Sequence, residues 1–101
     1  MNELSLPSIH DVLELLRRLD DASVGADGVT TQFLEVRNEL QSGGVCVNGN
    51  RNGLIHLARL TLEVAAKDFV GAHQHLDADG EVDNCEVPLT IGLKPAEWDV
   101  R

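Results

Sequence analysis

This sequence is poor in aromatic residues, cysteines and basic side chains. It contains no tyrosine, and its aromatic residues are Phe33, Phe69 and Trp98, so a core must come from Leu, Val, Ile and Ala. The two cysteines, Cys46 and Cys85, are too few and too scattered for a disulfide framework. We therefore expect both to be small, reduced residues inside strands.

Long hydrophobic runs are also missing. No stretch approaches eighteen uninterrupted apolar residues, and the N-terminus lacks a basic region followed by an apolar one. We expect neither a membrane span nor a signal peptide, and hence a cytoplasmic protein. A length of 101 residues with 43% hydrophobic and 25% charged residues is typical of one soluble globular domain.

Acidic residues dominate the charge. Seventeen acidic side chains against eight basic ones give a formal net charge of −9, and residues 77–101 alone carry seven acids and two bases. Such a field repels nucleic acids and anionic membranes and favours a basic partner, although solubility alone also explains an acidic surface.

Residues 44–77 predict a strand, a helix and a second strand in one compact unit. Val45 and Val47 favour a short strand, and the Asn-rich turn after it supplies Asn50 as the expected N-cap of the helix. Gly71 is the expected stop, and residues 72–76 are expected to form the second strand. The apolar helical positions are Leu54, Leu57, Ala58, Thr61, Val64 and Ala65, and the opposite, polar side carries His56, Arg59, Glu63 and Lys67.

Three further elements flank this unit. Apolar spacing predicts a helix over residues 9–20, with Ser8 as N-cap and Asp11 at the positive end of its dipole. Residues 31–37 fit a strand or a helix, and β-branched residues favour a strand that returns through a hairpin at 41–44. Strict alternation over residues 85–93 predicts a strand with one buried face. Because Pro88 lacks an N–H, we expect it at a sheet edge or with its nitrogen pointing away from any partner strand.

These elements predict an α+β fold. A small, mostly antiparallel sheet is covered by the central amphipathic helix, and an additional N-terminal helix completes a single domain over residues 1–101. Its parts are the N-terminal helix at about 9–20, the α+β core at about 31–94 and a short tail at 95–101.

The pair His73 and His75 is the strongest candidate for chemistry. On a strand, both imidazoles would project from the same face, and Asp77, two residues further on, would follow on that face. This spacing suits a metal ion. His10 and His56 are further candidate ligands. The simpler interpretation is a polar strand face with hydrogen-bonded histidines, and we predict neither a metal nor another cofactor.

Other patterns argue against catalysis. The acidic residues 77–84 lack the glycine position of a calcium-binding EF-hand loop, and the glycines of residues 48–53 match no phosphate-binding motif. Neither cysteine shows the electropositive, exposed surroundings of a reactive thiol. The sequence therefore predicts no catalytic residues, and we expect the protein not to be an enzyme.

A set of short motifs spans roughly residues 35–93. It comprises Gly49, Asn50, Gly53, Leu54, Leu57, Ala58, Leu60, His73, His75, Leu76, Asp77, Val87, Leu89 and Ile91. This pattern resembles the immunity protein 32 family of bacterial polymorphic-toxin systems, but it leaves residues 1–30 and Trp98 unaccounted for. The resemblance implies a small α+β protein that binds and blocks a cognate toxin.

Three functions thus stay open: an immunity protein that binds a basic toxin domain, a metal-binding protein or metal-dependent enzyme using His73 and His75, and a homodimer formed by an exposed edge strand. For the first, the expected partner-binding residues are His73, His75, Asp77, Asp79, Glu81, Asp83 and Trp98.

Overall fold

The computed structural model describes residues 7–22, 31–39, 41 and 43–95, and it contains two helices and five strands in this part of the chain. The prediction of an α+β fold with an N-terminal and a central helix is confirmed. The elements are α1 (Ile9–Asp21), β1 (Leu34–Glu39), β2 (Gly44–Gly49), α2 (Arg51–Ala65), β3 (His73–Leu76), β4 (Asn84–Cys85) and β5 (Leu89–Gly92).

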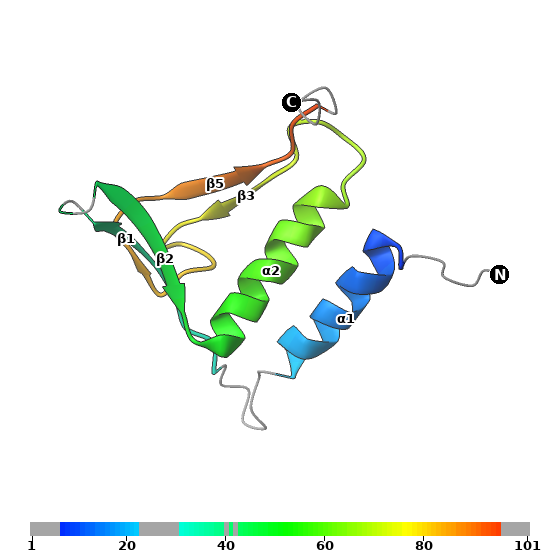
Figure 1. Ribbon diagram of the computed structural model, residues 1–101, viewed down its shortest axis with the longest axis horizontal. Helices are drawn as coiled ribbons and strands as arrows, with labels where there is room; N and C mark the ends of the chain where they lie inside the picture. The colour runs from blue at the N-terminus through cyan, green and yellow to red at the C-terminus, as the bar shows by residue number, and fades with distance from the viewer. Residues whose placement is uncertain (1–6, 23–30, 40, 42, 96–101) are drawn as a thin grey trace.

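Helix α2 is the middle layer of the structure. It packs against α1 on one side and against β2, β3 and β5 on the other (Figure 1). Within the described residues, neither helix is long and apolar enough to cross a membrane.

Both helices begin at the caps that the sequence predicts. The Ser8 hydroxyl accepts from the Asp11 N–H, and the Asp11 carboxylate accepts from the Ser8 N–H, which is a complete capping box. The Asn50 side chain accepts from the Gly53 N–H at 2.7 Å and also from the Phe33 N–H at 3.0 Å. The second cap therefore also joins the start of α2 to the segment that leads into β1.

The start of α2 needs a glycine for a steric reason. Gly53 is buried, and a Cβ at this position would collide with the carbonyl oxygen of Phe33. The first turn of the helix can therefore lie directly against the chain entering β1 only because Gly53 has no side chain.

The strands form two sheets rather than the single sheet that we expected. The first has the order β2-β1-β4, with β1 antiparallel to β2 and parallel to β4, and the second pairs β3 with β5 antiparallel. The hairpin between β1 and β2 is confirmed, with Gly43 at a φ of 76° in the connection.

The prediction of one continuous strand over residues 85–93 is wrong. Its first residues pair with β1 as β4, and its last residues pair with β3 as β5. The interruption falls at residues 86–88, which include Pro88, a residue without the N–H that a ladder requires. The predicted alternation of burial nevertheless persists over residues 85–93, so the same side of the segment faces the core in both sheets.

Two element boundaries also differ from the prediction. Helix α2 ends at Ala65 with Ala66 as its C-cap, so Gly71, at a φ of 95°, turns the chain into β3 instead of ending the helix. Strand β1 begins at Leu34 rather than residue 31, because Asn50 binds the backbone of residues 31–33: its side chain takes the Phe33 N–H and donates to the Thr31 carbonyl.

The apolar core lies between α2 and the two sheets. Its buried members come from β1, α2, β3 and the segment before β4. They are Leu34, Val36, Leu60, Leu76 and Val82, and partly buried residues such as Val47, Leu57 and Leu89 pack around them.

Candidate functional site

His73 and His75 lie on the exposed side of β3, as the strand spacing predicts. Their rings meet edge to face with centroids 4.8 Å apart. Nδ1 of His73 lies 2.9 Å from the Gly71 carbonyl oxygen, and Nδ1 of His75 lies 3.2 Å from the hydroxyl oxygen of Thr90. Both histidines thus have neighbours to bond, as in the simpler interpretation of this pair.

The structure does not extend this pair into a set of metal ligands. In the part of the chain that it describes, no group of three or more His, Cys, Asp or Glu side chains is arranged to hold a metal ion. Asp77, the expected third ligand, instead accepts the Asp79 N–H at 3.1 Å in a turn that also joins the Gly80 N–H to the Asp77 carbonyl. His56 and His10 lie on α2 and α1, and neither belongs to β3.

Residues 77–86, which we call the acidic segment, carry five carboxylates and no lysine or arginine. The carboxylates belong to Asp77, Asp79, Glu81, Asp83 and Glu86. This segment connects β3 to β4 and continues just past β4.

Two of these carboxylates hold the acidic segment to β1. Asp83 accepts the Leu34 N–H at 2.9 Å, and Glu86 accepts the Asn38 N–H at 2.8 Å. The backbone of the same residues also bonds to β1, since the Asp83 N–H donates to the Leu34 carbonyl and the Glu86 N–H to the Val36 carbonyl. The acidic segment is therefore fixed to the sheet by its own side chains.

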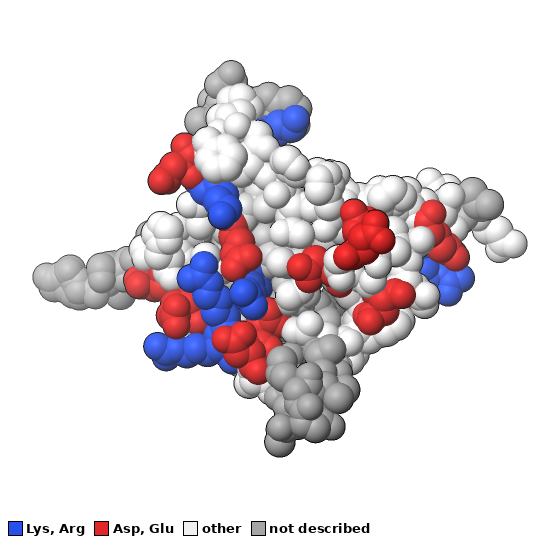
Figure 2. Space-filling view, turned by 180° about the vertical axis from the view of Figure 1, so that it is seen from behind, with Lys and Arg blue, Asp and Glu red and all other residues white. Residues whose placement is uncertain are grey.

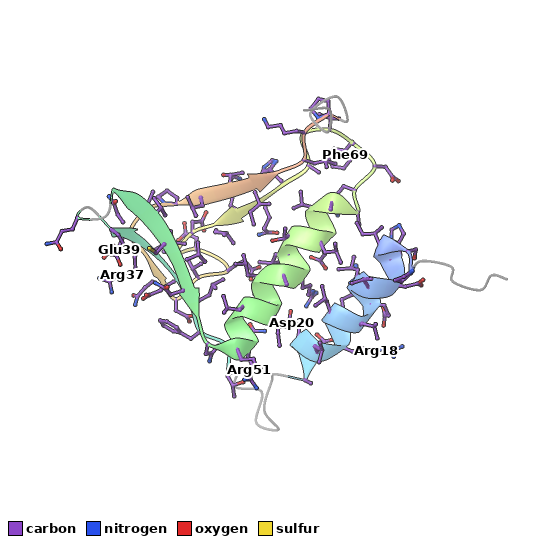
Figure 3. All side chains as sticks on the ribbon, in the orientation of Figure 1. Arg18, Asp20, Arg37, Glu39, Arg51 and Phe69 are labelled. Carbon is purple, nitrogen blue, oxygen red and sulfur yellow. The ribbon has the colours of Figure 1, made fainter. Side chains whose placement is uncertain are left out.

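A third carboxylate, Glu81, belongs to a cluster that the sequence did not reveal. Its oxygen lies 2.6 Å from Nε2 of His56, whose Nδ1 lies 2.6 Å from the Asp20 carboxylate. Asp20 also accepts from Arg59 at 2.7 Å and from the side-chain amide of Gln32. We call Asp20, His56, Arg59 and Glu81 the His56 cluster; Figure 3 shows Asp20 between α1 and α2.

Burial and opposite charges act against each other on the pKa values of this cluster. Burial alone would raise the pKa of the Asp20 carboxyl, which is 2% exposed, but hydrogen bonds and positive charge from His56 and Arg59 bring it below its ordinary value. Burial alone would lower the pKa of His56, but hydrogen bonds to Glu81 and Asp20 and their negative charges raise it. The bond to Asp20 likewise raises the pKa of Arg59.

Both ring nitrogens of His56 lie within hydrogen-bond distance of a carboxylate oxygen, and this arrangement favours the protonated ring, in which both nitrogens carry an N–H. With both nitrogens engaged, the ring has no free position from which to accept a substrate proton. The arrangement ties together α1, α2 and the acidic segment, and this structural role needs no ligand.

Sequence reasoning placed His56 and Arg59 on the polar side of the central helix but assigned them no partner in this cluster. In the structure, α1 covers part of this side and brings Asp20 to it. The sequence did contain a signal for this cluster. Asp20 lies at the margin of the apolar side of one amphipathic helix, and His56 and Arg59 lie one turn apart on another.

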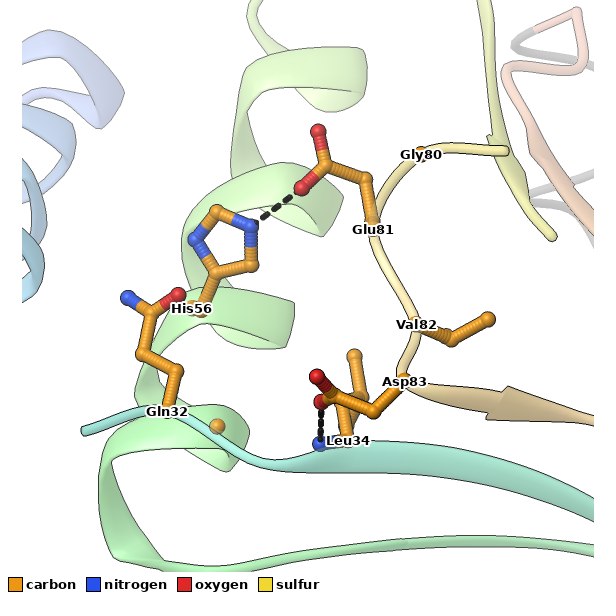
Figure 4. A pocket seen from close by; sticks show the side chains of 8 residues that line it. Gln32, Leu34, His56, Gly80, Glu81, Val82 and Asp83 are labelled. Carbon is orange, nitrogen blue, oxygen red and sulfur yellow. Dashed lines mark hydrogen bonds and ion pairs between the residues drawn. The ribbon is translucent and has the colours of Figure 1, made fainter. Parts of the chain in front are cut away.

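A small cavity opens beside the His56 cluster. Its volume is about 140 Å³, and its walls come from Gln32, Leu34, α2 and the acidic segment (Figure 4). Its lining includes no serine, threonine, cysteine or lysine that could act as a nucleophile. The lining residues are Gln32, Leu34, Gly53, His56, Gly80, Glu81, Val82 and Asp83.

Charge is distributed differently over the two halves of the molecule. Around α1 and α2, arginines pair with acids, as in Arg17 with Glu63 at 3.5 Å and Arg18 with Glu14 at 3.4 Å. Figure 2 shows blue and red side chains intermingled at one side of the molecule and red ones without blue neighbours over its middle.

The remaining predicted contact residue, Trp98, lies outside the described residues.

No family model matches this chain, and no curated protein or solved structure matches it at a significant level. The resemblance to the immunity protein 32 family stays a prediction.

Proposed function

We propose that this protein is an acidic binding protein that neutralises a basic toxin domain by direct contact, as the resemblance to the immunity protein 32 family implies. The supporting observation is the acidic segment, which gathers five carboxylates and contains no lysine or arginine. Glu81 among them is bound to His56. A surface of one sign attracts an oppositely charged partner and speeds its association.

The acidic segment is also preorganised. Asp77, Glu81, Asp83 and Glu86 are each held by a hydrogen bond inside the protein, while Asp79 is exposed. Each of these bonds engages one oxygen of its carboxylate, so the second oxygen can face a partner. Ordering these side chains before binding reduces the entropy that a complex would otherwise lose.

The test uses the toxin domain that the resemblance implies to be encoded beside this protein. Cells that produce the toxin domain should survive when this protein is coproduced, and the purified pair should form a complex whose association rate falls as salt rises. Lack of both protection and complex formation would contradict the proposed function.

A matched pair of variants locates the interface. Asp79→Asn removes an exposed charge from the acidic segment, and Asp68→Asn removes the same charge from an exposed position outside it. We expect Asp79→Asn to slow association with the toxin domain several-fold more than Asp68→Asn does. Equal rates for the two variants would remove the acidic segment from the interface while leaving the inhibitor function standing.

A further inference from the structure

Strand β2 lies at an open edge of the three-stranded sheet. The order β2-β1-β4 leaves one side of β2 without a partner strand among the described residues. In Figure 1 this strand runs from the hairpin down to the start of α2. An open edge presents unpaired N–H and C=O groups that another strand can bind.

The register shows which residues present these groups. The Asn50 N–H donates to the Phe33 carbonyl, and the pairing of β1 with β2 continues in the same register as far as Glu39 opposite Gly44. Because hydrogen-bonded pairs alternate along an antiparallel ladder, Cys46 and Asn48 bond to β1. The backbone groups of Val45 and Val47 therefore point to the open edge.

This edge lacks two of the features with which proteins protect such strands, charged side chains and proline. Residues 44–49, with the sequence GVCVNG, contain no charged residue and no proline. Val45 is 47% exposed, and Leu54, which lies beside Gly49, is 45% exposed. Apolar surface thus adjoins the open backbone groups.

The sequence of β2 fits a second copy of itself. Val45, Cys46 and Val47 read the same in both directions, so an antiparallel pair centred on Cys46 sets each Val45 opposite Val47 of the other copy. The absence of charge on β2 lets two chains of net charge −9 meet here without opposing acids on the paired strands. A two-fold axis requires this kind of self-complementary surface.

We propose that β2 pairs antiparallel with β2 of a second copy, in the register centred on Cys46, to form a homodimer with a continuous six-stranded sheet. Val45 and Val47 of each copy supply the new hydrogen bonds. Cys46 then lies opposite its counterpart in a non-hydrogen-bonded pair, with Cα atoms about 4.5 Å apart, within the range that a disulfide spans. This inference does not depend on the proposed function.

The first experiment measures the mass of the purified protein in solution. The wild type should have twice the chain mass of 11.0 kDa. Val45→Pro removes an N–H that points away from β1, so the variant should keep its fold and become a monomer. Val45→Thr keeps both the N–H and the branched shape, and it should remain a dimer.

Circular dichroism on each variant verifies the fold. A wild type that is monomeric from micromolar to millimolar concentration would overturn the proposal, and so would a folded Val45→Pro variant that remains dimeric.

A second experiment covers the case in which Val45→Pro does not fold. Diamide takes two electrons and two protons from a pair of thiols, which become a disulfide while diamide is reduced to the hydrazine. Cys85→Ser should still give a covalent dimer on this treatment, and Cys46→Ser should not. A dimer whose Cys46 residues fail to link would overturn the proposed register.

Salt separates this inference from the proposed function. Screening reduces the repulsion between two chains of like charge, so higher salt should strengthen the homodimer. The same salt should weaken a complex with a basic toxin domain. The absence of the homodimer would therefore leave the proposed toxin binding standing, and the absence of toxin binding would leave the proposed homodimer standing.

Discussion

The two sides of α2 are held by different kinds of interaction. Toward the sheets, the helix buries Leu60 against Leu34 and Val36, with side chains almost fully removed from solvent. Toward α1 and the acidic segment, it uses His56 and Arg59 to bind Asp20 and Glu81. The first side gains stability from apolar burial at any pH, whereas the second depends on the protonation of its groups.

The largest expected effect comes from the apolar side. Leu34→Ala removes a side chain that is 1% exposed and leaves a cavity, which should lower the free energy of unfolding by about 4 kcal/mol. Urea denaturation measures this loss, and Leu15→Ala, the same substitution at a 58% exposed position of α1, is the control. Equal losses for the two variants would show that Leu34 is not part of a packed core.

A somewhat smaller effect is expected on the charged side. Asp20→Ala leaves His56 and Arg59 without their shared carboxylate, and breaking a buried pair in this way should cost about 3 kcal/mol. The neighbouring Asp21 is 80% exposed, so Asp21→Ala should change stability little. If the two aspartate variants were equally stable, the His56 cluster would not hold α1 in place.

The smallest effect concerns pH and applies to the charged side alone. The pKa of His56 is raised above its ordinary 6.5, so its contribution is complete below that pH and is lost as pH rises through the folded-state value. The pKa of Asp20 is lowered from 3.8, so its contribution is present above that pH and is lost on acidification through the folded-state value.

Urea denaturation measured between pH 3.8 and pH 6.5, and again at alkaline pH, should therefore show that the free energy of unfolding falls as pH rises above 6.5. His56→Gln should remove most of this dependence, while His75→Gln, at an exposed position, should keep it. A fall of the same size in His56→Gln would assign the dependence to another group.

The same contrast explains how much of the structure the sequence predicts. Apolar periodicity located both helices, and local residue types located the hairpin and the caps Ser8 and Asn50. Burial on one helix face and capping both leave patterns within a few residues of the sequence. Periodicity could not show that the strands form two sheets. The alternation of apolar residues at Val87 and Leu89 is the same whether the segment pairs with one sheet or with two.

The His56 cluster lay beyond prediction for a related reason. Asp20 and His56 come from different helices, and a charged side chain on an amphipathic helix reads as solvated until the helix that covers it is placed. The acidic segment was predictable as a charged loop, but the bonds from Asp83 and Glu86 to β1 depend on a strand pairing between residues almost fifty positions apart.

That parallel pairing of β1 with β4 also bears on how the chain folds. The β1–β2 hairpin and α2 are contiguous in sequence, so they can form early and together. Leu34 and Val36 stay uncovered on one side until Val82 and Cys85 arrive from the far end of the chain, which makes the closing of a long loop a late step. During synthesis, the first half would therefore leave the ribosome with its most buried side chains still open to water.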